Sequence, residues 1–156
     1  MIKVGGDKMK YNRNQELDYK IEKLTKDNQA FVQDNIFGEA DLKFIDDFIV
    51  DKNAIGYFVY SNDDVLGYIH GYVLTRLQNR PMLYVHNMSV KKKYRHLGIG
   101  TLMMETMKHH AKEHNLSKIF LMTSKSNKRA VELFKKEKGK VPHKDDMVFV
   151  WDEEDL

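Results

Sequence analysis

The sequence predicts an α/β protein, in the wider sense that includes α+β folds, with a mixed central sheet of about six or seven strands and helices on both faces. Segments rich in Val, Ile and Tyr alternate with amphipathic segments along the chain. The order strand, helix, strand between Met82 and Thr123 forms a βαβ unit, which requires parallel pairing within the sheet. A length of 156 residues predicts a single domain over 1–156.

Composition excludes several classes of protein. The chain has no cysteine, which rules out a disulfide scaffold, a cysteine-ligated metal site and a cysteine nucleophile. No stretch reaches 18 apolar residues, and Met1–Lys20 lacks the apolar core of a signal peptide. We therefore expect a soluble, cytoplasmic protein with no membrane partner. Its first residues, Met1–Asn14, should form either a loose arm or a poorly ordered start.

Charge is unevenly distributed. The net charge of the chain is +3. Residues 91–140 hold 14 basic and 4 acidic residues, or +10, and the remainder therefore carries −7. Such a basic segment favours an anionic partner such as a phosphate ligand, a nucleic acid or a membrane surface. Lysine-rich, solvated helix faces are the alternative.

Periodicity assigns the first elements. Asp18–Leu24 alternates polar and apolar residues, as a strand does, and two helices follow at Asp27–Phe37 and Asp41–Val50, with Asp41 as the N-cap of the second. A hairpin of strands then covers Ile55–Tyr60 and Val65–Leu77.

The hairpin turn contains Asp63 and Asp64, which we interpret as turn formers. The next strand, Met82–Val90, is apolar on both pleat faces, which is typical of a central strand covered on both sides.

The following helix should run to about His114 and end at Asn115. Its apolar residues recur every four positions and should face the sheet: Ile99, Met103, Met107 and Ala111. His109 and His110 are expected to face solvent.

The remaining elements are a buried strand at Lys118–Thr123, a helix at Asn127–Lys138 ending at Gly139, and a last strand at Met147–Trp151. The acidic tail that follows should be solvated.

A glycine-containing turn, Arg95–Gly100, lies between a predicted strand and a predicted helix. Unpaired N–H groups at a helix start, together with the helix dipole, favour an anion. Gly98 and Gly100 let the backbone approach phosphate oxygens closely, and the lysines at 91–93 add positive charge. The spacing differs from both the dinucleotide-binding and the nucleoside-triphosphate glycine motifs.

These residues resemble the GNAT superfamily of acetyl-CoA dependent N-acetyltransferases over about Lys20–Trp151. Asn87–Met103 is similar to the acetyl-CoA motif of that family, and Asn127–Lys136 to its second signature. Gly71–Arg76 and Tyr84–Val90 further resemble the aminoglycoside 3-N-acetyltransferase branch.

The resemblance implies the GNAT fold, acetyl-CoA as cosubstrate, no metal and transfer to a primary amine by direct attack. It also implies a set of cofactor-binding residues: Met88, Ser89, Val90, Arg95, His96, Leu97, Gly98, Ile99, Gly100, Thr101, Asn127, Ala130 and Phe134. A backbone N–H, such as that of Met88, would stabilise the developing oxyanion.

Catalysis needs a base for the ammonium and a proton for the leaving thiolate. His86, Tyr84 and His70 lie on the two strands expected to flank the acceptor, and His86 is preferred because an imidazole ordinarily titrates near pH 6.5. A packed role in the core is the alternative for these residues. To protonate the leaving thiolate the family often uses a tyrosine, and this chain has Phe134 at that position.

Several acceptors remain open. The aminoglycoside branch has an acid where this chain has Asn87, so aminoglycosides, polyamines, other small amines, amino acids, protein lysines and protein N-termini are all candidates. A CoA-binding regulator without catalysis is a further alternative. No nucleic-acid partner is expected, since the basic patch is short and no groove-reading motif is present. The resemblance favours a homodimer.

Overall fold

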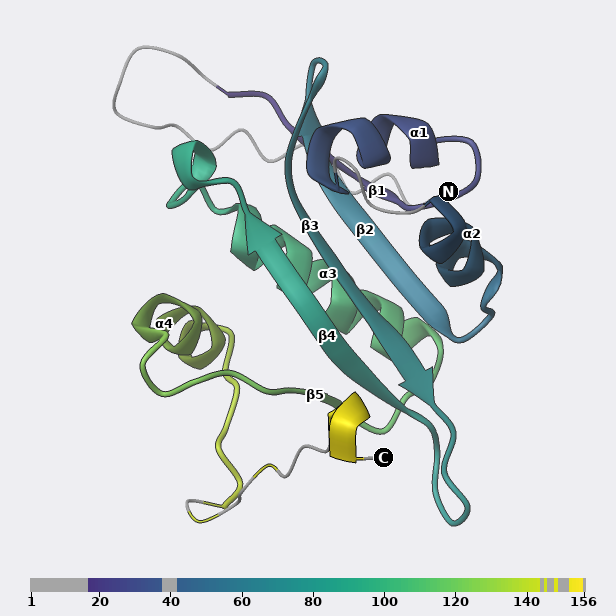
Figure 1. Ribbon diagram of the computed structural model, residues 1–156. Coiled ribbons are helices and arrows are strands. Elements are labelled where there is room, and N and C mark those ends of the chain that lie inside the picture. Colours follow the sequence, from purple (N-terminus) through teal and green to yellow (C-terminus); the bar gives the residue numbers. More distant parts are fainter. Residues whose placement is uncertain (1–16, 38–41, 144, 146–147, 149–151, 156) are drawn as a thin grey trace. The chain divides into compact units, whose positions relative to one another are not determined.

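The computed structural model describes residues 17–37, 42–143, 145, 148 and 152–155 (Figure 1). It divides into two compact units, residues 1–124 and residues 125–156, which are described separately below. Among the described residues, the first unit carries the sheet and three α-helices, and the second carries the fourth α-helix.

The first unit is built on a mixed sheet of five strands in the order β1-β2-β3-β4-β5. Pairing is antiparallel from β1 through β4, and β4 pairs with β5 in parallel, which confirms the predicted βαβ unit. The strands are β1 (Lys20–Lys23), β2 (Ala54–Ser61), β3 (Asp64–Leu74), β4 (Met82–Val90) and β5 (Ile119–Leu121).

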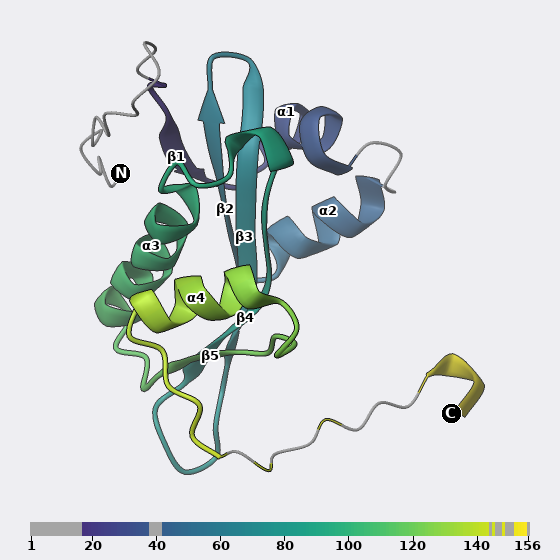
Figure 2. The same ribbon diagram turned by 90° about the vertical axis from the view of Figure 1, so that its left-hand side faces the viewer.

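Helices cover both faces of this sheet, as predicted. Helix α3 (Ile99–Glu113) lies on one face, and α1 (Gln29–Val32) and α2 (Leu42–Val50) lie on the other (Figure 2). A π-helical turn, Gln33–Phe37, continues α1, so the predicted helix over 27–37 changes its hydrogen-bonding pattern halfway. The predicted N-cap of α2, Asp41, lies outside the described residues.

The four-residue stripe predicted on α3 forms part of the core. All four of its members are buried, and Met103 and Met107 are fully so. The helix ends as expected, because Asn115 adopts a left-handed conformation with φ 53°. His110 contradicts the prediction, since it is buried and stacks on His114 with ring centroids 3.9 Å apart.

Two predicted strands are shorter or less buried than expected. Strand β3 ends at Leu74 rather than Leu77, and Leu77 is fully exposed in the loop that follows. The residues of β5 are only half-buried, so the predicted buried strand at 118–123 is wrong in its burial.

The second unit contains α4 (Lys128–Lys136). Asn127 is its N-cap, with the side-chain oxygen accepting from the Ala130 N–H at 3.3 Å. The helix closes as predicted, since the Gly139 N–H donates to the Phe134 carbonyl at 2.8 Å after Lys138 turns left-handed. The described strands number five against the six or seven expected, and the predicted strand Met147–Trp151 lies outside the described residues apart from residue 148.

Candidate active site

A β-bulge interrupts β4 in the middle of the sheet. Asn87 pairs with His70 and Val85 pairs with Gly71, so His86 is an extra residue without a partner in β3. The strands approach closely at this point, because a Cβ on Gly71 would lie 2.1 Å from the carbonyl oxygen of Tyr84. Glycine is therefore required there by the neighbouring backbone.

The bulge determines which side chains of β4 are exposed. Leu83 and Val85 are buried, whereas His86, Asn87 and Ser89 are exposed. The prediction of a strand covered on both faces is therefore wrong for the second half of β4. The physical reason is that α1 and α2 lie over β2 and β3 and leave this part of β4 uncovered (Figure 2).

The edge of β4 that faces away from β3 is only partly paired. Strand β5 pairs with Leu83, Tyr84 and Val85 and then ends. Within the first unit, no described strand pairs with residues 86–90 along that edge. Such an edge offers backbone N–H and C=O groups to an extended ligand.

The start of α3 provides a second set of unpaired donors. Gly98 is its N-cap, with φ 82° and no side-chain cap, and the amides of residues 98–101 have no acceptor among the described residues. These N–H groups lie at the positive end of a 15-residue helix. Of the turn predicted to bind an anion, the backbone N–H groups at Gly98, Ile99 and Gly100 are therefore unpaired in the described structure, whereas that of Arg95 donates to the Lys92 carbonyl at 3.4 Å.

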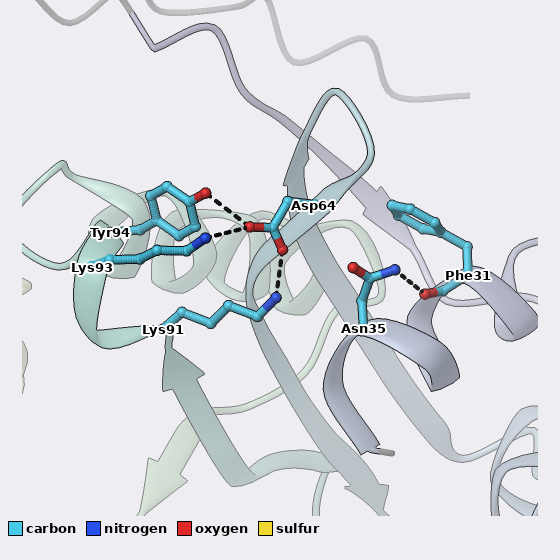
Figure 3. Close-up of polar contacts among 6 residues, drawn as sticks. All are labelled: Phe31, Asn35, Asp64, Lys91, Lys93 and Tyr94. Atoms are coloured by element: carbon cyan, nitrogen blue, oxygen red, sulfur yellow. Dashed lines mark hydrogen bonds and ion pairs between the residues drawn. The ribbon is translucent and has the colours of Figure 1, made fainter.

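Asp64, which was predicted only to form a turn, holds the basic loop before the start of α3. The Asp64 carboxylate pairs with the Lys91 ammonium at 2.5 Å and the Lys93 ammonium at 2.9 Å, and accepts from the Tyr94 hydroxyl at 2.8 Å (Figure 3). The hydrogen bond from Lys91 is the main cause that lowers the pKa of Asp64.

This cluster corrects the expectation that all three lysines at 91–93 add free positive charge. The ammonium groups of Lys91 and Lys93 are committed to Asp64, so they shape the loop more than they attract an anion. No local sequence signal could show this, because Asp64 and Lys91 are separated by 26 residues.

Two further bonds fix the turn from outside the loop. The Arg95 guanidinium donates from Nε to the Val90 carbonyl at 3.0 Å, and the Tyr19 hydroxyl donates to the Leu97 carbonyl at 2.8 Å. Both donors are side-chain groups and both acceptors are carbonyl oxygens, so neither bond uses a backbone N–H group of the turn.

Side chains on the α1 and α2 face of the sheet form an aromatic cluster that surrounds the bulge. Neighbouring rings have centroid separations of 5.0 to 6.5 Å. The members are Phe48, Tyr68, His70, Tyr72, Tyr84, His86 and Phe120. The structure thus brings together the three residues predicted as candidate bases, with Nδ1 of His86 3.3 Å from the Tyr84 hydroxyl.

His70 and His86 differ in their surroundings. His86 is exposed, whereas His70 is largely buried and its Nδ1 has no hydrogen-bond partner among the described residues. Burial, with repulsion from His86 adding to it, lowers the pKa of His70 to about 4. His70 is therefore a neutral imidazole at pH 7.

The predicted cofactor-binding residues fall into two groups. One group is continuous along β4, the loop and the start of α3, comprising Met88, Ser89, Val90, Arg95, His96, Leu97, Gly98, Ile99, Gly100 and Thr101. The other belongs to the second unit, comprising Asn127, Ala130 and Phe134. In that unit the Asn127 side chain already caps α4.

The same described part of the chain shows neither a membrane span nor a metal site. None of its helices has the length and apolar character needed to cross a membrane. No group of three or more His, Asp or Glu side chains within it is placed to hold a metal ion.

Solved structures with the same fold include several acetyltransferases. An aminoglycoside acetyltransferase from an uncultured soil metagenomic sample matches with a TM-score of 0.69 and 16% identity, covering 85% of this chain and 94% of that one. A ribosomal-protein-alanine N-acetyltransferase from Brucella melitensis biovar Abortus 2308 matches with a TM-score of 0.70 and 14% identity, covering 85% and 99%. At these identities the likeness establishes the GNAT fold alone.

Curated relatives match over part of their length. The chain is 32% identical over 89 residues to a probable N-acetyltransferase, san, of Drosophila melanogaster, covering 56% of this chain and 48% of the relative. It is 33% identical over 88 residues to probable N-acetyltransferase 14 of Xenopus tropicalis, covering 56% and 41%. The chain thus matches less than half the length of either relative.

A family model spans most of the chain, from β1 through the end of α4. Residues 19–139 match that of the acetyltransferase (GNAT) family. The matched range contains the bulge, the open edge of β4 and the helix start described above. The chain therefore belongs to the acetyltransferase (GNAT) family.

Proposed function

We propose that the protein is an acetyl-CoA dependent N-acetyltransferase that acts on a primary amine. The observation that carries this proposal is the set of unpaired N–H groups at residues 98–101, placed directly after a strand with an open edge. A diphosphate fits the first feature, because it accepts several hydrogen bonds and is favoured by the helix dipole. An extended amide-containing arm fits the second.

In this proposal the pantetheine arm lies along Met88 and Val90 and the acetyl group lies at the bulge. The N–H of Met88 is one donor for the oxygen on which negative charge develops. Asn127, Ala130 and Phe134, which the resemblance implies as cofactor-binding residues, stay part of this proposal. The resemblance to CoA-bound relatives supports this assignment, since one solved aminoglycoside N-acetyltransferase with the same fold contains CoA.

The reaction is a direct displacement. The neutral amine nitrogen bonds to the acetyl carbon, the carbon–sulfur bond breaks, and the proton lost from nitrogen balances the one that the thiolate gains. His86 is our candidate for the base, because it is exposed beside the bulge and contacts the Tyr84 hydroxyl. His70 is a poorer candidate, since its imidazole is buried at the side of the cluster nearer α2.

A charge-reversing change in the helix start tests the anion site. Gly100→Asp places a carboxylate in the first turn of α3, where the helix dipole favours it, and Gly100 does not have a positive φ. The variant should therefore fold as well as the parent but bind acetyl-CoA at least about 100-fold more weakly, because the carboxylate repels the diphosphate. Asn79→Asp, in the exposed loop after β3, is the control for the added charge.

The measurement is isothermal titration with acetyl-CoA, together with thermal unfolding. A ligand present at 100 times its Kd should stabilise the parent and the control by roughly 2.7 kcal/mol. Equal acetyl-CoA affinity in the parent and in Gly100→Asp would exclude the helix start as the diphosphate site.

A CoA-binding regulator remains the second candidate function, favoured by the absence of a hydroxyl at Phe134. Release of free CoA with any primary amine separates the two. The protein adds no background to a colorimetric thiol assay for CoA, because its chain has no cysteine. The homodimer expected from the resemblance is also a proposal, which sedimentation of the full chain would test.

A further inference from the structure

A cavity of about 230 Å³ lies beneath α1 and α2, against the β2 and β3 part of the sheet. Its walls are mainly aliphatic and aromatic, and no acidic or basic side chain other than His70 contributes to them in the part of the chain that is described. The lining includes Leu24, Val32, Phe44, Ile45, Phe48 and Phe58.

The cavity adjoins the candidate active site at one residue. His70 lines the cavity, and its ring centroid lies 5.3 Å from that of His86. Phe48, another lining residue, packs edge-on against His70, with ring centroids 5.5 Å apart. A molecule with its amine beside His86 can therefore extend past His70 into an apolar space.

The rim of the cavity is accessible from outside. Phe44 lines it and is 71% exposed, which is unusual for a large apolar side chain in a helix. On the inner side, Val32 and Phe58 are almost completely buried. The cavity therefore has an apolar floor, a histidine in its wall and an exposed aromatic residue at its rim.

We infer that this cavity holds the apolar group of the acceptor, and that the acceptor is a primary amine carrying an aryl or similar apolar group on a short alkyl chain. This inference rests on the proposed function. Size supports it, because an apolar cavity of about 150 Å³ binds benzene, and 230 Å³ adds room for a short linker. The apolar surface of such a ring, once removed from water in the cavity, contributes substantially to affinity.

Charge argues against a polycationic acceptor at this position. An aminoglycoside carries several ammonium groups, which need carboxylates or other acceptors around them. The described lining supplies no carboxylate, and Asn87 beside the bulge is neutral. The acceptor should accordingly be recognised by apolar contact, with its single amine left near His86.

The test compares 2-phenylethylamine with ethylamine, which has the same reacting group and no ring, and with the aminoglycoside kanamycin. With acetyl-CoA and the full chain, kcat/KM for 2-phenylethylamine should exceed that for ethylamine by about 100-fold, the size expected for burying one ring. A ratio near one, or a higher kcat/KM for kanamycin, would overturn the inference while leaving acetyl transfer intact.

A variant pair links this preference to the cavity. Phe44→Ala should reduce kcat/KM for 2-phenylethylamine by about tenfold and leave that for ethylamine unchanged, because only the ring contacts Phe44. Val50→Ala is the matched control, since Val50 is exposed on the same helix and does not line the cavity. Equal losses for both amines, or equal effects of both variants, would contradict the cavity as the binding site.

A binding measurement separates this inference from the proposed function. If no amine is acetylated, the proposed function fails, and thermal unfolding with 2-phenylethylamine then decides the inference alone. Stabilisation of the parent and of Val50→Ala, with little stabilisation of Phe44→Ala, supports an aryl site in the cavity. No stabilisation of any form by 2-phenylethylamine, under conditions where the protein is folded, overturns it.

Discussion

His70 and His86 lie on neighbouring strands with ring centroids 5.3 Å apart, yet they are not cross-strand partners, because His70 pairs with Asn87. The bulge at His86 moves the two imidazoles into different environments. The His70 ring is partly buried, with its Nδ1 buried and without a hydrogen-bond partner among the described residues, whereas His86 is exposed beside the Tyr84 hydroxyl. Two residues of one type therefore have different chemical environments.

Replacement of His86 tests its proposed role as the base. His86→Gln should lower kcat at pH 7 by about 100-fold, since general-base catalysis typically contributes that much or more. His109→Gln is the control, because His109 is an exposed histidine of α3 that pairs with Glu113. The decisive measurement is the rate from pH 6 to pH 9, and an unchanged profile in His86→Gln would remove this residue from the mechanism.

The pH dependence of stability should reflect the two buried imidazoles. Burial lowers the pKa of both His70 and His110 to about 4, with repulsion from a neighbouring histidine adding to the effect. The unfolded chain takes up these protons near pH 6.5 and the folded protein does not, so stability is full above pH 6.5 and falls as pH decreases toward 4.

Urea unfolding at pH 7.5 and pH 4.5 measures this loss, which we expect to be roughly 1 to 3 kcal/mol for His110. His110→Phe removes the titrating group and keeps an aromatic ring against His114, so it should reduce the difference between the two pH values. A difference as large in His110→Phe as in the parent would show that His110 does not contribute.

Loss of the Asp64 carboxylate should destabilise the basic loop. Asp64→Asn removes both ion pairs, and because the groups are partly exposed we expect a decrease of about 1 kcal/mol in the free energy of unfolding at pH 7. Asp63→Asn, at the adjacent exposed turn position, should have no such effect. Denaturation in low and high salt checks the cause, since 1 M salt should shrink the difference.

The close approach of β3 and β4 makes Gly71 intolerant of any side chain. Gly71→Ala should cost about 3 kcal/mol or more, because the added methyl group meets the fixed backbone of Tyr84 at 2.1 Å. Gly56→Ala provides the comparison, since its added methyl group meets the movable Phe48 ring at 3.2 Å and should cost about 1 kcal/mol or less. Equal stability of the two variants would contradict this account of the bulge.

Local sequence patterns, such as the apolar repeat of α3, predict part of this fold correctly. The stripe of α3 repeats every four residues, so its buried members follow from helix geometry alone. His110 could have been found in the same way, because it lies three residues after Met107 and so falls beside that stripe. The burial of His110 was missed because its neighbours in the sequence are charged and polar.

Other features depend on contacts between distant segments. The ion pairs of Asp64 join a hairpin to a loop that begins 27 positions later. The exposure of His86 depends on its being the unpaired residue of the bulge, which breaks the alternation of β4. The cavity exists because α1 and α2 cross the sheet, which no single segment specifies. The glycine turn could be predicted because strand, turn and helix start are adjacent in the chain.

The attachment of the basic loop to the β2–β3 hairpin has a kinetic and an entropic consequence. A loop already fixed by Asp64, Tyr19 and the Arg95 guanidinium loses little conformational freedom when an anion arrives. Association should then resemble docking onto a rigid surface, with a rate governed by diffusion and electrostatic attraction and without a slow ordering step.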